Sequence, residues 1–284
     1  MKHLIILIFI AICNNIVAQD LLNNNISNYN PLSPPNTYNN IDNPNYWKNK
    51  IPYPGYWQQD VHYLITAEII DTLNMINGKQ TLIYTNNSPD NLEYVFFHLY
   101  ANAFEPDSYL DKFRKSNKML TVYREDEKKK KGLEIQSISS NGQNLKTEID
   151  NTIMKVFLDK PLESGETISF DIEFQSYFGG NQEEGNVRRR MKVYEEYGNK
   201  HYNGVHWYPR ISVYDRKFGW TTDQHLGKEF YGNFGCFDVE LTFPDNYIVE
   251  ATGNMLNREE VLPKELMKKL NIANFANKKF DTPP

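Results

Sequence analysis

Alternation of apolar and polar residues with a period of two recurs in short segments along much of the chain. Residues 61–69 alternate in this way, and Phe237, Val239, Leu241 and Phe243 alternate with polar neighbours. This period is the signature of a strand with one buried face. Most of the segments follow one another through turn residues, without a helical pattern between them. Many short strands at close spacing predict an all-β chain, mainly an antiparallel β-sandwich, rather than βαβ units.

Further strands are expected at residues 80–86, 92–99, 133–139, 143–149, 153–158 and 167–174. Asn77-Gly78 and Asn141-Gly142 are two-residue signals that typically close β-hairpins. Residues 244–246 predict another turn, with a returning strand at residues 247–251. Two short helices are expected as well, one around residues 108–118 in an insertion between strands and one at residues 263–270. The charged run 125–131 is typical of a solvated loop tip, and residues 179–198 look like an excursion from the sheets.

The first 18 residues have the features of a cleaved signal peptide. Lys2 and His3 precede an apolar run that is too short to span a bilayer, and Ala18 fits a cleavage site. A lipoprotein anchor at Cys13 is disfavoured because Ile12 stands where a small residue is usually needed. The sequence therefore predicts a secreted or periplasmic protein. An Asn- and Pro-rich disordered leader is expected at residues 19–45, a β domain at 46–258, and a helix and linker at 259–284.

Composition excludes several classes of protein. The formal net charge of −5 does not favour binding to nucleic acid or to an anionic membrane. The mean hydropathy of −0.64 excludes a protein with many membrane spans. Cleavage after Ala18 leaves Cys236 as the only cysteine, so no intrachain disulfide can form. We expect Cys236 to be a buried free thiol at the start of a strand.

No catalytic or metal-binding motif is complete in the sequence. A Gly-rich phosphate loop, a Gly-x-Ser-x-Gly elbow and an H-E-x-x-H pair are all missing. His225 and Glu229 have one spacing of a zinc pair, but their loop is rich in glycine, which disfavours the aligning helix. His201 and His206 could meet across a bend, although hydrogen-bonded surface histidines are the favoured alternative. Paired carboxylates for glycoside hydrolysis stay open.

Large rings crowd the glycine-punctuated loop that precedes the last predicted strand. The most prominent are Trp207, Tyr208, Trp220, Phe230 and Tyr231. A solvent-exposed connector does not need so many rings. They could form a satellite aromatic core under the loop. Alternatively, they could pack against a second domain or line the edge of a pocket.

The same loop and several predicted strands resemble a known family. HWYPRISVYD (206–215) and KEFYGNFGCFDVELTFPDNYIVEATG (228–253) resemble the end of the N-terminal β domain of aminopeptidase N-like zinc metallopeptidases, particularly their secreted bacterial branch. YWQQDVHYLITAEIIDTLNMINGKQTLIYTNNS (56–88), YVFFHLYANAF (94–104) and PLESGETISFDIEFQ (161–175) look like earlier strands of that domain. The pieces follow the family's order and together cover residues 57–253.

The resemblance implies a saddle-shaped N-terminal β domain followed by a thermolysin-like catalytic domain. In the family that second domain holds zinc in an H-E-x-x-H motif, and none of its catalytic or metal residues maps onto this chain. The chain would then be inactive alone, with the peptidase domain of the same protein as its partner and peptide as the substrate. Many members also contact the free amine of the substrate from a strand just before Trp-Tyr-Pro. That region is residues 200–205 here, so His201, Tyr202 and Asn203 are substrate-rim candidates by position.

The family's Gln or Glu is absent from that segment, which leaves the amine contact open. The resemblance also makes Trp207, Tyr208, Trp220, Phe230 and Tyr231 candidates for an interdomain face. A stand-alone secreted β-sandwich module that binds peptide or glycan without zinc is the alternative.

Overall fold

The computed structural model describes residues 55–119, 123, 127–129, 132–178, 191–194, 198–227 and 230–274. The chain divides into two compact units, Tyr53–Ile248 and a second that combines Met1–Pro52 with Val249–Pro284. The described part of the second unit contains α3 (Arg258–Val261), α4 (Lys264–Lys269) and η4 (Ile272–Asn274). Helix α4 confirms the short helix predicted at 263–270. The predicted signal peptide and leader lie outside the described residues, and no described helix is long and apolar enough to cross a membrane.

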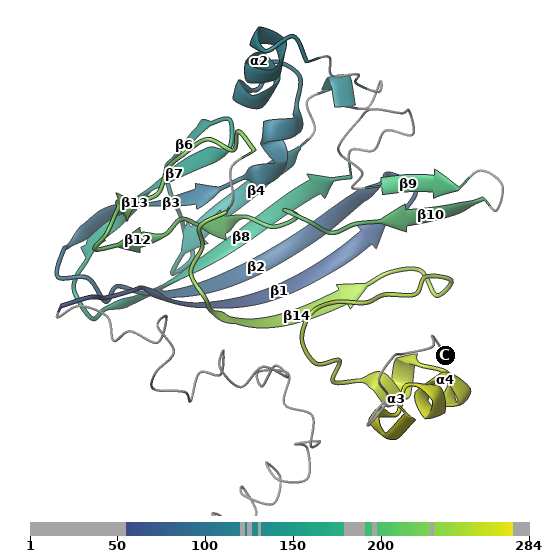
Figure 1. The fold of residues 1–284 in the computed structure, drawn as a ribbon. Helices are drawn as coiled ribbons and strands as arrows, with labels where there is room; N and C mark the ends of the chain where they lie inside the picture. The colour runs from purple at the N-terminus through teal and green to yellow at the C-terminus, as the bar shows by residue number, and fades with distance from the viewer. Residues whose placement is uncertain are drawn as a thin grey trace, which may run out of the picture. The chain divides into compact units, whose positions relative to one another are not determined.

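The larger sheet of the first unit has the strand order β14-β1-β2-β8-β4-β5 (Figure 1). Its strands are β1 (Asp60–Ile70), β2 (Met75–Thr85), β4 (Leu133–Ser140), β5 (Gln143–Asn144), β8 (Thr167–Tyr177) and β14 (Cys236–Thr242). Neighbours pair antiparallel except β14, which runs parallel to β1. Alternate residues of β1 from Val61 to Ala67 are buried, as the period of two predicts.

A smaller sheet packs against the first and has the order β11-β3-β7-β6. Its strands are β3 (Leu92–His98), β6 (Thr147–Asp150), β7 (Ile153–Leu162) and β11 (Arg210–Ile211). One cluster of buried side chains joins the two sheets. At its centre Phe97 of β3 meets Phe170 of β8 edge to face, with ring centroids 5.7 Å apart. The mainly antiparallel, all-β sandwich expected from the sequence is confirmed. Two short ladders complete the first unit, β9 (Met191–Tyr194) with β10 (Asn199–Tyr202) and β12 (Tyr214–Asp215) with β13 (Gly219–Trp220).

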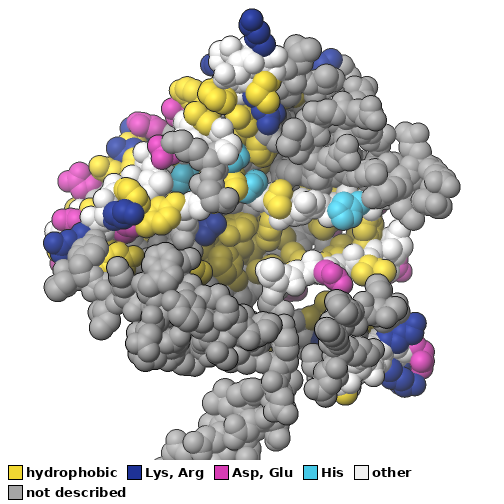
Figure 2. All heavy atoms as spheres, in the orientation of Figure 1, with side chains coloured by type: hydrophobic (Ala, Val, Ile, Leu, Met, Phe, Trp, Pro, Cys, Tyr) yellow, Lys and Arg dark blue, Asp and Glu magenta, His cyan; other side chains and the backbone are white. Residues whose placement is uncertain are grey.

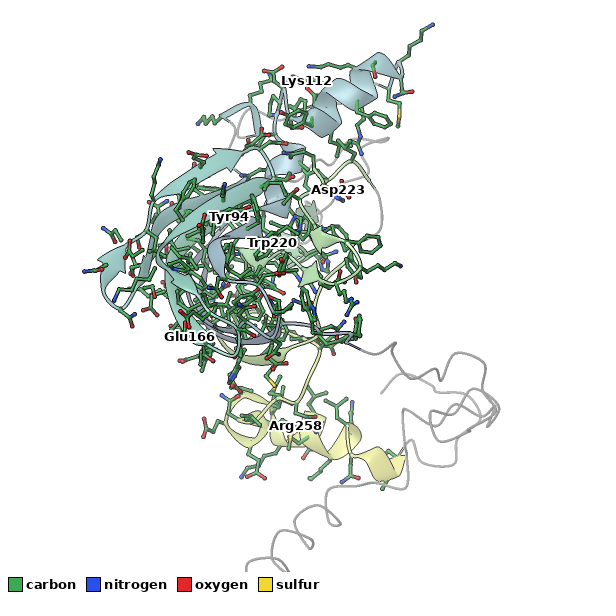
Figure 3. The ribbon with its side chains drawn as sticks, turned by 90° about the vertical axis from the view of Figure 1, so that its left-hand side faces the viewer. Tyr94, Lys112, Glu166, Trp220, Asp223 and Arg258 are labelled. Atoms are coloured by element: carbon green, nitrogen blue, oxygen red, sulfur yellow. The ribbon has the colours of Figure 1, made fainter. Side chains whose placement is uncertain are left out.

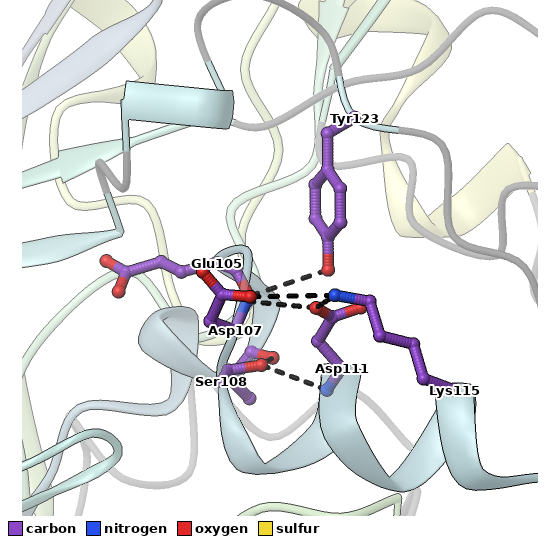
Figure 4. Close-up of polar contacts among 7 residues, drawn as sticks. Glu105, Asp107, Ser108, Asp111, Lys115 and Tyr123 are labelled. Carbon is purple, nitrogen blue, oxygen red and sulfur yellow. Dashed lines mark hydrogen bonds and ion pairs between the residues drawn. The ribbon is translucent and has the colours of Figure 1, made fainter.

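The predicted helical insertion is confirmed as α2 (Tyr109–Ser116), which follows the 3-10 helix η2 (Tyr100–Phe104). The Ser108 hydroxyl accepts the backbone N–H of Asp111 at 3.1 Å and so caps the helix (Figure 4). The buried Asp111 carboxylate pairs with the Lys115 ammonium at 2.7 Å. Burial opposes ionisation, but Lys115 and the Asp107 backbone N–H outweigh it, so the pKa of Asp111 is lowered. Of the predicted charged tip, the structure describes Tyr123 before it and η3 (Glu127–Lys129) within it.

The hairpin predicted at Asn77-Gly78 is wrong, because both residues lie inside β2. The chain turns earlier, between β1 and β2, where Asn74 adopts a φ of 52°. Gly78 lies opposite Phe174 of β8, and a Cβ on Gly78 would lie 2.3 Å from the Cζ atom of the Phe174 ring. The neighbouring strand's ring, rather than a turn, therefore requires glycine at this position.

The structure also corrects the prediction for residues 236–251. β14 is an outermost strand of its sheet, and residues 247–251 form no returning strand beside it. Cys236 is exposed rather than buried. Phe237 stacks on buried Tyr63 at 4.7 Å, yet its side chain stays 45% exposed. Edge placement explains the exposure, since among the described residues only β1 pairs with β14.

The single strand predicted at residues 143–149 is divided between the two sheets. The turn at Asn141-Gly142 is confirmed, with φ of 51° and 76°, and it leads into β5 beside β4. Leu145 is then buried in the core cluster, and β6 pairs with β7 of the smaller sheet. The chain thus crosses the sandwich where one continuous strand was expected.

Candidate functional site

The aromatic loop after β11 covers the outer face of the smaller sheet. The backbone N–H of Ser212 donates to the Phe96 carbonyl at 2.8 Å. Further along, Gln224 Oε1 accepts from both the N–H and the hydroxyl of Thr152, at 3.1 and 2.6 Å. Trp220 packs edge to face on Phe96 at 5.6 Å, and Figure 3 labels Trp220 on the loop and Tyr94 on β3. The loop therefore forms a third layer over the sandwich.

Three of the five interdomain-face candidates pack within this unit. Trp207, Tyr208 and Trp220 are half-buried against the main core. Tyr208, for example, meets the buried ring of Tyr63 at 5.5 Å. Tyr231 is 40% exposed, and its hydroxyl donates to the Asp215 carboxylate. These three rings extend the main core rather than forming a separate satellite core, and the interdomain role of the five stays a prediction.

Three histidines from distant segments meet in one cluster, which we call the histidine cluster. His98 ends β3, His206 precedes Trp207, and His225 lies on the covering loop. Tyr100 joins them, stacked on His98 at 4.6 Å and lying 5.3 Å from His206 and 5.8 Å from His225. Phe104 and Phe230 complete the cluster, with Phe230 only 4.4 Å from His206. Figure 2 shows histidine side chains among hydrophobic ones on this view of the molecule.

His98 is the most buried member of the cluster, with 3% of its surface exposed. Neither ring nitrogen has a hydrogen-bond partner among the described residues. Burial, and next the Arg210 charge, lower the pKa of His98 from 6.5 to about 4. The Thr221 backbone and the Asp223 carboxylate oppose this shift, although the Thr221 contact lacks hydrogen-bond geometry. His98 is consequently a neutral imidazole at physiological pH.

The histidine cluster is not arranged as a metal centre. Within the described ranges, no group of three His, Cys, Asp or Glu side chains is placed to hold a metal ion. The ring centroids of His206 and His225 lie 5.8 Å apart. His206 does not meet His201 in a bend, and His201 is exposed on β10. His206 also adopts a left-handed φ of 55°, an uncommon conformation for a residue with a side chain. Glu229, the other half of the considered zinc pair, lies outside the described residues.

The substrate-rim candidates divide into one anchored residue and two exposed ones. The Tyr202 hydroxyl donates to Asn74 Oδ1 at 2.9 Å, and its ring lies 4.7 Å from that of Phe178. Burial, followed by the neighbouring Tyr247, raises the pKa of Tyr202. His201 and Asn203 are exposed on either side of it. Of the three, His201 and Asn203 are therefore the side chains that face solvent.

Comparison with known proteins finds partial likeness to solved zinc metallopeptidases. No protein-family model matches the chain, and no curated protein matches it. A mutant M1 zinc metallopeptidase from Deinococcus radiodurans, bound to a Tyr-Ser-Ala substrate, is 16% identical with a TM-score of 0.36, over 69% of this chain and 35% of that one. A mutant two-domain M1 zinc metallopeptidase bound to L-tryptophan is 17% identical with a TM-score of 0.29, over 48% and 24%. The chain thus spans about a quarter to a third of the length of these two structures.

Sequence reasoning missed Arg210, a charged residue beside the histidine cluster. Arg210 of β11 pairs directly with His98 of β3. Its guanidinium donates to the Asn233 carbonyl at 3.2 Å and forms no ion pair among the described residues. Arg210 belongs to the quoted WYPR segment, but only the pairing of β11 with β3 shows which residue it faces.

Proposed function

We propose that this chain supplies the N-terminal β domain of a secreted, zinc-dependent, aminopeptidase-like metallopeptidase. In this role the domain docks on a catalytic domain of the same protein and shapes the access of peptide to its cleft. Zinc in the catalytic domain would activate the water that attacks the peptide bond. This chain's own residues would bind and orient, with His201 and Asn203 at the substrate rim.

One observation carries the proposal: segments that resemble the family in sequence order become neighbours in space. Residues 56–88 form β1 and β2, residues 161–175 lead into β8, and residues 228–253 contain β14. In the structure these strands are adjacent, in the order β14-β1-β2-β8. Scattered chance similarities would not be expected to fall on adjacent strands of a single sheet. This arrangement supports the proposal that the resemblance extends over a structural domain.

The rings Trp207, Tyr208 and Trp220 support a docking role in a limited way. They are half-buried within this unit, packed against its core. Docked surfaces are commonly rich in aromatic side chains. Tyr231 and Phe218, which contact each other at 5.5 Å and are 40% and 58% exposed, add apolar surface to the same loop.

The test is made on the polypeptide encoded by the complete gene. We expect the coding sequence after Pro284 to contain H-E-x-x-H, and the full polypeptide to release aminoacyl chromophores in a reaction that a chelator stops and zinc restores. The 284-residue chain alone should neither hydrolyse these substrates nor bind zinc stoichiometrically. A stop codon after Pro284, or one zinc bound per 284-residue chain, would overturn the proposal.

A pair of variants tests the rim assignment of Asn203 in the full polypeptide. Asn203→Ala is expected to raise the KM for aminoacyl substrates and to leave kcat nearly unchanged, because it removes a binding contact remote from the zinc. Asn87→Ala, a matched asparagine change on the exposed surface, serves as the control. Equal KM values for both variants would remove Asn203 from the rim.

A stand-alone glycan- or peptide-binding module is the alternative, and a ladder of rings favours it. Trp57, Tyr214, Trp220 and Phe96 follow one another at centroid distances of 5.2, 4.7 and 5.6 Å, and all are half-buried. Such rings can stack on sugar or peptide faces. Binding of the 284-residue chain to a glycan or peptide array, abolished by Trp57→Ala and accompanied by a stop codon after Pro284, would favour this function.

A further inference from the structure

Helix α2 lies apart from the two sheets and exposes apolar side chains (Figure 1). Leu110 is buried, but Tyr109 is 43% exposed and Phe113, on the same face one turn later, is 49% exposed. Met119, just after the helix, is 50% exposed. Figure 2 shows hydrophobic and basic side chains next to each other at this end of the molecule. Exposed apolar side chains that gather in one place commonly mark an interaction surface.

The chain folds back after α2, which keeps Met119 close to the last turn of the helix. The backbone N–H of Met119 donates to the Arg114 carbonyl at 2.9 Å. The N–H of Lys118 donates to the Lys115 carbonyl at 3.0 Å. These two bonds form the Schellman motif, whose left-handed position is usually glycine. Here it is Lys118, with φ of 59°, so the motif keeps a positive charge next to Met119 at some cost in backbone energy.

The lysines of this region differ in their partners. Lys115 pairs with the buried Asp111 carboxylate at 2.7 Å and lies 3.6 Å from the Asp107 carboxylate, so it fixes the helix in place (Figure 4). Lys112 and Lys118 are exposed and have no carboxylate partner among the described residues. The Lys112 ammonium lies 5.6 Å from the centre of the Tyr109 ring, and Figure 3 labels Lys112 on the helix. Residues 109–119 contain four basic residues and one acidic residue, a local charge of +3 in a chain whose net charge is −5.

We propose that the exposed side of α2, with Lys118 and Met119, binds the surface of a bilayer that contains anionic phospholipids. Tyr109, Phe113 and Met119 would enter the headgroup region, while Lys112 and Lys118 would pair with lipid phosphates. Such a surface offers negative charge and apolar material together, which matches a patch where cations without partners border exposed rings. A second copy of this chain would instead bring like charges together at this patch, which is unfavourable.

This surface is independent of the proposed peptidase role, because it needs only residues of α2 and the turn after it. The 284-residue chain is mixed with vesicles of phosphatidylcholine, or of phosphatidylcholine and phosphatidylglycerol in equal amounts, and bound protein is measured by flotation. We expect tighter binding to the mixed vesicles, and a loss of this preference at high salt. The apolar N-terminal segment would bind both kinds of vesicle, so the preference reports on the charged contact.

Two variants test the charged and the apolar part of the contact. Lys118→Gly removes one charge and suits the left-handed backbone, so it should not lower the thermal stability, yet it should weaken binding to the mixed vesicles about fivefold. Phe113→Ala removes the exposed ring, keeps a good helix former, and should weaken this binding by a similar factor. Lys160→Gln and Phe218→Ala change exposed residues outside α2 and should bind as the unaltered chain does. Thermal unfolding without vesicles confirms that each variant is folded.

Weaker binding in the two α2-region variants alone supports the proposal. Equal binding of the unaltered chain to both kinds of vesicle would overturn it, as would equal losses in these variants and in the two controls. The proposal also fails if Phe113→Ala binds the mixed vesicles as tightly as the unaltered chain. The contact would then be purely electrostatic, which fits an acidic protein surface rather than a bilayer.

Discussion

Two buried polar groups near opposite ends of β3 differ in their partners. Asn86 directly follows β2 and bonds to Asp90, two residues before β3 begins. It is fully buried, and its amide makes five hydrogen bonds. Its oxygen accepts from Gln59 and twice from Ser88, and its nitrogen donates to the carbonyls of Asp90 and Leu162. At the other end, His98 is buried and its two ring nitrogens have no hydrogen-bond partner among the described residues.

This difference separates a polar centre satisfied within the chain from one whose ring nitrogens have no partner among the described residues. The Asn86 network ties β2 to the end of β7, and every polar atom of its amide is satisfied within the chain. The group around His98 and Arg210 leaves hydrogen-bonding capacity unused, which lowers stability unless something supplies it. Between the two ends, the same strand places Val95 and Phe97 in the shared core. One strand therefore links a fully hydrogen-bonded region with a region whose polar groups are not fully hydrogen-bonded.

The largest expected effect comes from the middle of the strand. Phe97→Ala removes a ring that is completely buried between the sheets, so it should lower the free energy of unfolding by about 3–5 kcal/mol. Phe218→Ala, at a ring that is 58% exposed, should change it by less than about 0.5 kcal/mol. Chemical denaturation measures both. Similar losses for the two variants would mean that the sandwich interface is not the main source of stability.

The pH dependence of the unfolding free energy tests the difference between the two ends of β3. The pKa of His98 is lowered to about 4 in the folded chain, so the unfolded chain binds a proton first as the pH falls. The stability linked to neutral His98 is complete above pH 6.5 and is lost progressively toward pH 4, for a total of about 3 kcal/mol. His98→Phe should remove this part of the pH dependence. Identical slopes of unfolding free energy for both proteins between these pH values would contradict the lowered pKa.

Removing the satisfied amide should cost more at neutral pH than removing the unsatisfied ring nitrogens. Asn86→Ala leaves the Gln59, Ser88 and Leu162 groups without partners, and we expect a loss of about 2 kcal/mol. His98→Phe breaks no hydrogen bond with the described residues and keeps a ring against Tyr100, so its loss should stay below about 1 kcal/mol. Urea unfolding at neutral pH compares them, and the reverse order of losses would invalidate the distinction between the two ends.

The sequence predicted the body of the sandwich because its signals are local. Alternation placed β1, β3 and β8 within a few residues of their observed bounds, and Ser108 marked the start of α2 correctly. The hairpin at Asn77-Gly78 was wrong for a non-local reason. Glycine there makes room for Phe174, a residue of another strand, and no pattern within β2 reveals that contact.

The candidate site was only partly predictable for the same reason. The rings of the loop and the histidines could be picked out one by one, but His206 meets His225 and Tyr100 only after the loop has folded over the smaller sheet. Arg210 drew no attention in the sequence, because an arginine after Trp-Tyr-Pro has no local sign of lacking a counter-charge. The exposure of Cys236 likewise depends on β14 being an outermost strand.

The smallest expected change in stability concerns the hydrogen bonds that hold the covering loop to the smaller sheet. Gln224 joins the loop to the sheet, accepting from Thr152 and donating to the Asp150 carbonyl at 2.8 Å. Gln224→Ala removes these bonds and leaves the buried Thr152 N–H unpaired, which should cost about 1 kcal/mol. Because the loop is a separate layer, the loss should appear as local opening rather than as global unfolding.

Amide hydrogen exchange distinguishes these two cases. In Gln224→Ala, exchange at the backbone N–H of Thr221, which donates to the Val213 carbonyl at 2.9 Å, should become about fivefold faster, while the amides of β1, β2 and β8 keep their rates. Thr222→Ala alters an exposed neighbour on the same loop and should leave both sets unchanged. Equal acceleration in the loop and in the larger sheet would show that the layer unfolds together with the sandwich. The His98 end of β3 could then not open without the Asn86 end, and the distinction between the two ends would fail.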